Sequence, residues 1–434
     1  MEADLLQNPN RALLNTTTRT TQSSLLRGCL GSLDGACIEK LLLHCASALE
    51  SNDVTLAQQV MWVLNNIASL VGDPNQRLTA WFLRALIARA STVCPPTSIN
   101  DNNFDGSSTI IQRRLMTVTE LAGYVDLIPW HRFGFCASNG LIFKAIQGFN
   151  KVHILDFSIT HCMQWPTLID ALAKRPEGPP SLRITVPSIR PPVPPLVNVS
   201  IEEVGLRLAN FAKFRDVPFE FNVIESKDFI TSFDFESLMN VTYQEDEALV
   251  INCQNWIRYL SDEEHRNNIV ASDVASRDDF LAVIKGLNPC LVIVVDEDSD
   301  LSGPSLASRI TACFNYLWIP FDALETFLPK DSRQRIEFES DIGRKIENII
   351  SFEGGQRIER LESGIKLSQR IRNNGFSSVP FCEEIVKEVK GLLDENASGW
   401  GMKREEDMLV LTWKGHNSVF ATAWAPSPCG SYVD

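Results

Sequence analysis

The segment Val152–Leu155 constrains the fold most, because it is a short apolar run that stops on an acid, Asp156. Near-continuous apolar runs of this length are typical of strands buried on both faces of a parallel sheet. A helical pattern of apolar residues begins near Met163. An acid at the carboxyl end of such a strand stands where open α/β sheets bind ligands. A nucleotide site would need glycines in this turn, and there is none between Gly148 and Gly178.

Strand and helix patterns alternate through residues 151–434. Helical stripes over 200–214 and 276–286 separate apolar runs that we predict as strands: Val152–Phe157, Leu182–Val186, Pro218–Ile224, Ala248–Cys253, Cys290–Asp296 and Gly375–Phe381. Two further β runs, Asp407–Trp413 and Ser418–Trp424, are joined by a short loop with Gly and Asn, which is typical of a hairpin. We therefore predict an α/β fold over 151–434 with a Rossmann-like, class I methyltransferase-like core sheet and a terminal antiparallel hairpin.

The first 150 residues lack this alternation. Residues 1–27 are rich in Asn, Thr and Ser, so we expect a flexible N-terminal tail. Apolar residues at three- and four-residue spacing over 28–150 predict an N-terminal helical cap, with Asp53 and Asp73 as N-caps. The insert 304–350 is also helical in pattern, and we expect it to pack on the cap.

A leucine zipper is the alternative interpretation of the cap. Apolar residues recur every seventh position from Leu42 to Leu70. A coiled coil needs one unbroken helix, and Ser51–Asp53 interrupts this one, so separate packed helices are favoured.

Charge and composition restrict the partners. The chain has 54 Asp and Glu against 40 Lys and Arg, a formal net charge of −14, which weakens non-specific attraction to nucleic acid. The pair Arg113 and Arg114 could still contact DNA locally, or could be solvated surface. No apolar run has the length of a membrane span, and the 11 cysteines form no C-x-x-C pair, so we expect a reduced intracellular compartment.

Catalytic and metal-binding patterns are largely absent. The chain has no G-x-S-x-G elbow, no phosphate-binding glycine loop and no metal spacing among its six histidines. The run Asp296–Asp298 could bind a metal or act as an acid/base set, although strand ends commonly carry solvated charges. His161 and Cys162 could be taken as a pair of metal ligands. Adjacent residues on a turn rarely direct their side chains to the same ion, so a structural role is favoured. We expect no catalytic residues, no cofactor and no metal, and the many tryptophans suggest an interaction module.

Several ordered motifs resemble the GRAS family of plant transcriptional regulators, in the Scarecrow-like group. Residues Leu42–Ala46 resemble the family's L-L-x-C-A helix, and Val152–Asp156 is similar to its VHIID motif. Two departures are Leu155, where Ile or Val is usual, and Cys162, where glycine is usual. The residues that we assign to the family motifs are Val152, His153, Ile154, Leu155, Asp156, Gln164, Trp165, Pro218, Phe219, Arg357, Glu359, Trp400, Trp413 and Trp424.

The resemblance also implies a set of regions and a function. The regions are a first leucine-rich region at about 28–95, a second at about 196–234, a PFYRE region at about 244–350 and a SAW region at about 353–426. A protein of this family would be a nuclear, non-enzymatic regulator of transcription. It would bind other transcription factors, form homo- or heterodimers within the family and bind no membrane. Direct contact with DNA is proposed for some members of the family and stays an open alternative. The alternative is an S-adenosylmethionine-dependent methyltransferase, or a protein that binds an adenosine-type ligand beside Asp156.

Overall fold

The computed structural model describes residues 34–427, apart from 94–114, 161, 190, 192, 194, 196, 225–245, 262–275 and 397. The predicted tail, Arg113, Arg114 and the end of the second leucine-rich region therefore lie outside the described residues. The chain divides into two compact units, one of residues 1–99 and 303–352, the other of residues 100–302 and 353–434. No helix of the described residues is long and apolar enough to cross a membrane.

The described part of unit 1 is a packed set of five helices. They are α2 (Gly35–Glu50), α3 (Val54–Ile67), α4 (Pro74–Val93), α11 (Leu306–Phe327) and α12 (Arg333–Ser351). The break between α2 and α3 falls where the sequence predicts it, and the Asp53 carboxylate accepts the amide of Leu56 at 3.0 Å. Asp73, which the sequence predicts as an N-cap, forms a capping box with Gln76 at the start of α4. These are separate helices, so the zipper interpretation is wrong.

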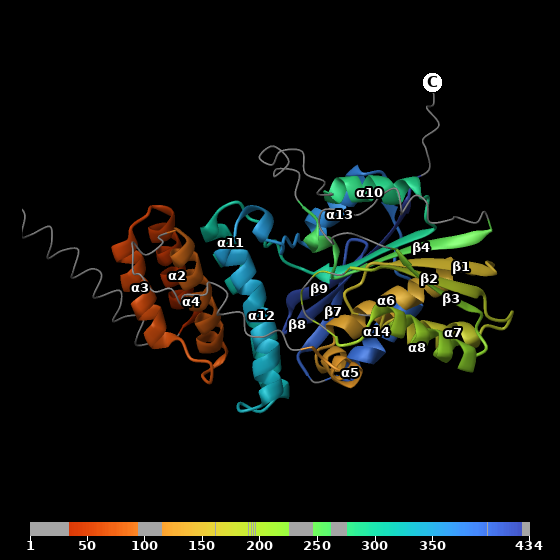
Figure 1. The fold of residues 1–434 in the computed structure, drawn as a ribbon, viewed down its shortest axis with the longest axis horizontal. Coiled ribbons are helices and arrows are strands. Elements are labelled where there is room, and N and C mark those ends of the chain that lie inside the picture. Colours follow the sequence, from red (N-terminus) through yellow and green to blue (C-terminus); the bar gives the residue numbers. More distant parts are fainter. Residues whose placement is uncertain are drawn as a thin grey trace, which may run out of the picture. The chain divides into compact units, whose positions relative to one another are not determined.

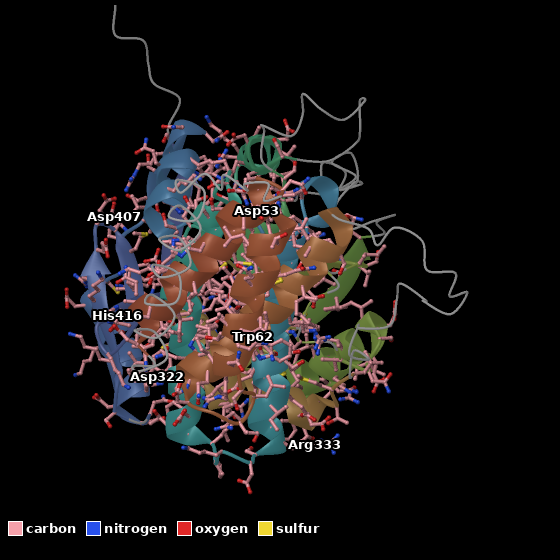
Figure 2. The ribbon with its side chains drawn as sticks, turned by 90° about the vertical axis from the view of Figure 1, so that its left-hand side faces the viewer. Asp53, Trp62, Asp322, Arg333, Asp407 and His416 are labelled. Atoms are coloured by element: carbon pink, nitrogen blue, oxygen red, sulfur yellow. The ribbon has the colours of Figure 1, made fainter. Side chains whose placement is uncertain are left out.

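One buried arginine joins three helices of unit 1. Arg77 on α4 is fully buried, and its guanidinium bonds Glu339 of α12 at 2.9 Å and Glu325 of α11 at 2.8 Å. The same group donates to the carbonyl of Gly72 at 2.6 Å. The insert helices α11 and α12 thus belong to one unit with α2 to α4. The outer face of α3 carries Trp62, which is 69% exposed (Figure 2).

Unit 2 contains a nine-stranded sheet in the order β3-β2-β1-β4-β5-β9-β8-β7, with β6 paired to β9. Strands β1 to β5 are parallel, and β9 runs antiparallel to β5 and to β8. This confirms the predicted Rossmann-like core and its terminal hairpin. The strand bounds are β1 (Lys151–Asp156), β2 (Ser181–Pro187), β3 (Phe219–Ile224), β4 (Glu247–Gln254), β5 (Leu291–Glu297), β6 (Phe376–Ser378), β7 (Trp400–Glu405), β8 (Met408–Trp413) and β9 (His416–Pro426).

Helices cover both faces of this sheet (Figure 1). One face packs on α6, α7, α8 and α14, and the other on α10 and α13. Their bounds, with those of α5 and two short 3-10 turns, are α5 (Val118–Leu127), α6 (Trp130–Ala145), α7 (Trp165–Ala173), α8 (Ile201–Phe214), η1 (Ile257–Tyr259), α10 (Arg277–Gly286), η3 (Gly354–Gln356), α13 (Gly364–Asn373) and α14 (Glu383–Asp394).

The predicted boundary of the helical cap at residue 150 differs from the structure. Helix α6 belongs to unit 2, where Phe133, Ala137 and Ile142 are buried in the same core as strands β1 and β5. Gly134 lies so close to β5 that a Cβ there would sit 2.8 Å from Val295. An apolar stripe shows that a helix has a buried face, and it does not show which element covers that face.

Two glycines inside helices allow a matched test of the packing. A Cβ at Gly343 of α12 would lie 2.1 Å from the Trp81 ring, whereas a Cβ at Gly391 of α14 would meet no atom within 4 Å. We predict that Gly343→Ala lowers the free energy of unfolding by about 1–3 kcal/mol through overpacking. Gly391→Ala should raise it by about 0.5–1 kcal/mol, because alanine loses less backbone entropy in a helix. Chemical denaturation measures both, and equal effects of the two changes would contradict the packing described.

Candidate functional site

The carboxylate of Asp156 lies at the carboxyl end of β1 and is almost completely buried. Its Oδ1 accepts from the Ser158 amide and from Asn252 Nδ2, each at 3.0 Å. Its Oδ2 accepts from Trp165 Nε1 at 2.7 Å and from Ser158 Oγ at 3.2 Å. A buried carboxylate needs such donors in place of water. Here the protein supplies four donors to the two oxygens.

Gln164 extends this network across the sheet. Its Oε1 accepts from Asn252 Nδ2 at 3.1 Å and from Gln254 Nε2 at 2.5 Å, so it is tied to β4. Its Nε2 donates to Asn139 Oδ1 on α6 at 2.9 Å. Gln254 also donates to Ser138 Oγ of α6 at 3.2 Å. Asp156, Gln164 and Trp165 are therefore brought together by the fold, and the segment between β1 and α7 is fixed to β4 and α6.

Sequence reasoning missed Asn252 and Gln254. Both follow an apolar run on β4, on the face that also carries Val250. Asn252 is the direct register partner of Asp156 across the parallel pair. Two amides at alternate positions of a buried strand were the available signal, since each must find partners on one face of the sheet.

Cys162 has a backbone conformation that favours glycine. Its φ is +62°, and its side chain is buried in the core beside α7. The left-handed region costs a residue with a Cβ roughly 1–2 kcal/mol. The backbone is therefore strained in the turn that follows β1. This is the position at which the family that the sequence resembles usually has glycine.

The acids at the end of β5 do not form a common site. Arg258 lies between Asp296 and Glu297, bonding Asp296 closely and Glu297 at 2.6 Å. Burial raises the pKa of Asp296, and the Arg258 guanidinium opposes that rise. Asp298 instead accepts from the Gly364 amide at 2.9 Å and from Asn417 at 2.7 Å. Among the described residues no group of His, Cys, Asp and Glu could hold a metal ion.

The predicted motif residues between 357 and 424 lie at other places in unit 2, and all are buried except Trp400, which is partly buried. Glu359 Oε2 lies 3.9 Å from Arg258, and Arg357 is also buried. The rings of Trp400 and Trp413, which are register partners on β7 and β8, have centroids 4.7 Å apart. The guanidinium of Arg372 lies 5.5 Å from the ring centroid of the fully buried Trp424.

The remaining motif residues are on β1 and at the start of β3. Val152, Ile154 and Leu155 are buried core residues, Pro218 directly precedes β3, and Phe219 is the first residue of β3. His153 is buried on the same face of β1 as Leu155, with Nε2 2.8 Å from Thr185 Oγ1. Burial, aided by the nearby positive charge of Arg183, lowers the pKa of His153 to about 3. His153 is therefore neutral at physiological pH.

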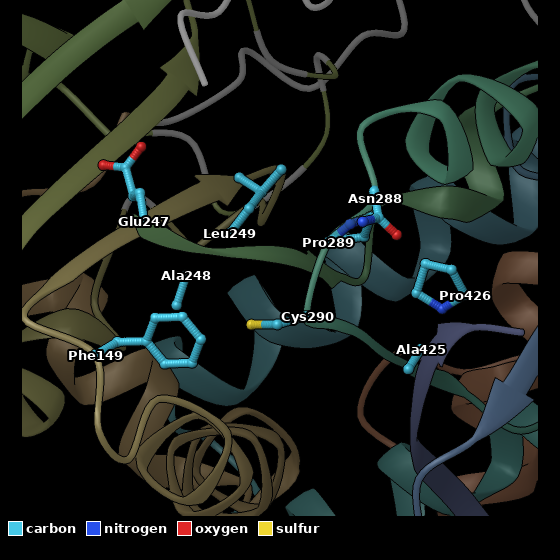
Figure 3. A pocket seen from close by; sticks show the side chains of 9 residues that line it. All are labelled: Phe149, Glu247, Ala248, Leu249, Asn288, Pro289, Cys290, Ala425 and Pro426. Atoms are coloured by element: carbon cyan, nitrogen blue, oxygen red, sulfur yellow. The ribbon is translucent and has the colours of Figure 1, made fainter. Parts of the chain in front are cut away.

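A pocket of about 310 Å³ lies at the opposite, amino end of β4 and β5 (Figure 3). Phe149, Asn288 and Cys290 are among its lining residues. Its one carboxylate, Glu247, is held by Arg183 of β2 at 3.1 Å. Burial raises the pKa of the Cys290 thiol to about 11, so the thiol stays protonated. The pocket thus offers no activated nucleophile or acid/base pair.

Fold and site together define a Rossmann-like protein whose first strand ends in a self-contained polar network. The chain matches the GRAS domain family over residues 38–425 and belongs to that family. It is 45% identical to Scarecrow-like protein 32 of Arabidopsis thaliana, over 94% of this chain and 98% of that protein. It is 31% identical to Protein SHORT-ROOT of Arabidopsis thaliana, over 90% of this chain and 73% of that protein.

Two further comparisons agree with this membership. The chain is 32% identical to the Scarecrow-like transcription factor PAT1 of Arabidopsis thaliana, over 88% of this chain and 75% of that protein. The crystal structure of SCL7 in Oryza sativa superposes with a TM-score of 0.71 at 23% identity, covering 89% of this chain and 99% of that one. The relatives are thus plant proteins that include a named transcription factor, and the solved structure shares the fold.

Substitutions of two buried tryptophans test how much the Asp156 network contributes to stability. Trp165 Nε1 donates to Asp156, whereas Trp424 Nε1 has no hydrogen-bond partner in the described part of the chain. We predict that Trp165→Phe lowers the free energy of unfolding by about 2 kcal/mol more than Trp424→Phe, because only the former removes a hydrogen bond to a buried charge. Urea denaturation of both variants measures the difference. Equal losses would show that the indole N–H contributes nothing.

The strain at Cys162 gives a second prediction. Cys162→Gly and Cys162→Ala both remove the buried thiol, but only glycine adopts a φ of +62° without strain. The glycine variant should be more stable than the alanine variant by about 1 kcal/mol, the reverse of the usual order. Thermal and chemical unfolding provide the measurement, and an alanine variant of equal or higher stability would contradict it.

Proposed function

We propose that the chain is a nuclear regulator of plant transcription that works by binding other transcription factors and catalyses no reaction. Membership of the GRAS domain family and the resemblance to a named transcription factor support the first part. The Asp156 network supports the absence of catalysis, because all four hydrogen-bond donors to this carboxylate come from the chain itself and give the carboxylate a structural role. Neither that carboxylate nor Asp296 is placed to move a proton to a substrate.

The outer face of α3 is the observation that carries the partner-binding proposal. All 14 residues of α3 are uncharged, in a chain with 22% charged residues. The exposed side chains around Trp62 are Gln58, Gln59, Asn65 and Asn66. Interface cores are depleted in charge and enriched in tryptophan. We propose this uncharged α3 face, centred on the exposed Trp62 of Figure 2, as the partner-binding surface.

A promoter-tethering assay in plant cells tests both parts of this proposal. The tethered chain should change reporter transcription, and Trp62→Arg should reduce the change at least several-fold, because the guanidinium would have to be desolvated in the interface. Ile365→Arg on α13 is the matched control, since Ile365 is 52% exposed in the other unit. An inert tethered chain would contradict the regulatory function. Equal activity of the two variants would contradict the α3 surface.

Cofactor binding beside Asp156 is tested separately. We expect calorimetry with S-adenosylmethionine to detect no heat at millimolar ligand, since the donors that a ligand would displace are already bonded inside the protein. Saturable binding would restore the methyltransferase alternative. Contact of Arg113 and Arg114 with DNA stays a prediction, because both residues lie outside the described ones.

A further inference from the structure

The pocket at the amino end of β4 and β5, hereafter the amino-end pocket, has an apolar wall. Its volume is about 310 Å³, and Phe149, Cys290 and Pro426 are among its lining residues. Phe149 is 37% exposed although its side chain is large and apolar, and Cys290 and Pro426 are partly buried. Figure 3 shows the Cys290 sulfur directed to the side of Phe149. A concave apolar surface of this size can bind an apolar group.

Strand β9 leads the chain to the rim of this pocket. Val292 of β5 pairs with Trp424 of β9 in an antiparallel register. The same register, continued by two residues, places Cys290 opposite Pro426, and both line the pocket. Ser427 is the last residue that the structure describes. The segment that follows Ser427 therefore starts beside the amino-end pocket.

The sequence of the next seven residues suits such a pocket. Residues 428–434 read Pro-Cys-Gly-Ser-Tyr-Val-Asp and lie outside the described residues. Their one aromatic residue, Tyr432, is six positions beyond Pro426, a span of about 20 Å when extended. Pro428 and Gly430 are residue types that favour a turn, so the segment can bend back on the pocket. Tyr432 is therefore within reach of the apolar wall.

We propose that residues 428–434 bind back into the amino-end pocket of their own chain, with the Tyr432 ring against Phe149 and Cys290. A tyrosine ring buries a large apolar area, and its hydroxyl needs a polar partner. The exposed side chain of Asn288 supplies that partner at the rim. This binding goes beyond the proposed function and does not rest on it.

Connectivity and charge favour this occupant over a free ligand. A short flexible link gives the segment an effective concentration in the millimolar range, so weak contacts suffice to hold it. Among the described lining residues only Glu247 is charged, and Arg183 bonds its carboxylate at 3.1 Å. A charged ligand would therefore meet no available counter-ion there, whereas an uncharged tyrosine ring needs none.

Alkylation of Cys290 by iodoacetamide, followed by peptide mass spectrometry, tests the docking. The thiol should react at least several-fold faster in Tyr432→Ala and in a chain shortened to Ser427, because the segment no longer covers it. Ser431→Ala is the matched control and should react like the unmodified chain. Cys37, a partly buried thiol of the other unit, should react equally in all variants. Equal Cys290 rates in the unmodified and shortened chains would overturn the proposal, as would equal acceleration by the two alanine variants.

Two further measurements identify the occupant of the pocket. Protection of Cys290 should be independent of protein concentration, and protection that grows with concentration would assign the pocket to a second copy and overturn the proposal. Oxidised glutathione should link Cys290 to Cys429 by thiol–disulfide exchange, in which the two thiol protons end on two molecules of reduced glutathione. Tyr432→Ala should lower the yield of this link several-fold. An unchanged yield would show that the thiols meet by chance and would also overturn the proposal. All these outcomes leave the tethering assay and the role of Trp62 untouched.

Discussion

Unit 2 depends on one electrostatic requirement, the need to satisfy the buried carboxylate of Asp156. A charge removed from water must find donors inside the protein, or it destabilises the fold. The donors come from the turn after β1, from the indole that starts α7 and from an amide on β4. Once they are placed, Gln164 is held between β4 and α6. The position that open α/β sheets commonly use for a ligand therefore organises the fold of this chain.

Arginine has a comparable role elsewhere in both units. Arg77 connects helices that are more than two hundred residues apart in sequence, and Arg258 holds the acids at the end of β5. Replacing such pairs by apolar residues is often neutral for stability. Removing only one partner destabilises the fold, because it leaves a buried charge without a partner. We infer that these pairs specify which helices and loops meet, while the apolar contacts of the two sheet faces supply most of the stabilisation.

The sequence predicted helices and strands well where they are determined by interactions between residues that are close in sequence. Apolar runs located β1 to β5, and the caps Asp53 and Asp73 located helix starts. The meeting of Asp156 with Trp165 was also accessible, since nine residues separate them across one turn. The alternate spacing of Asn252 and Gln254 was a signal, but their contacts with Asp156 and Gln164 could not be predicted, because polar residues at a strand end look the same whether they are solvated or buried. Strand β7 was missed because Trp400–Glu405 lacks the alternation of a half-buried strand. The packing of α6 on the sheet of unit 2 could not be predicted, because an amphipathic pattern shows which face of a helix is buried and does not show which element covers that face.

Strand β9 has a consequence for how the chain is made. It is the last of the described strands in sequence, yet it lies inside the sheet between β5 and β8. During synthesis β5 emerges more than a hundred residues earlier and has no neighbour on that side until His416–Pro426 leaves the ribosome. A nascent chain thus exposes an apolar strand edge for many seconds at ordinary elongation rates. Such an intermediate is a natural client for chaperones, and a premature stop codon shortly before His416 would leave it permanently incomplete.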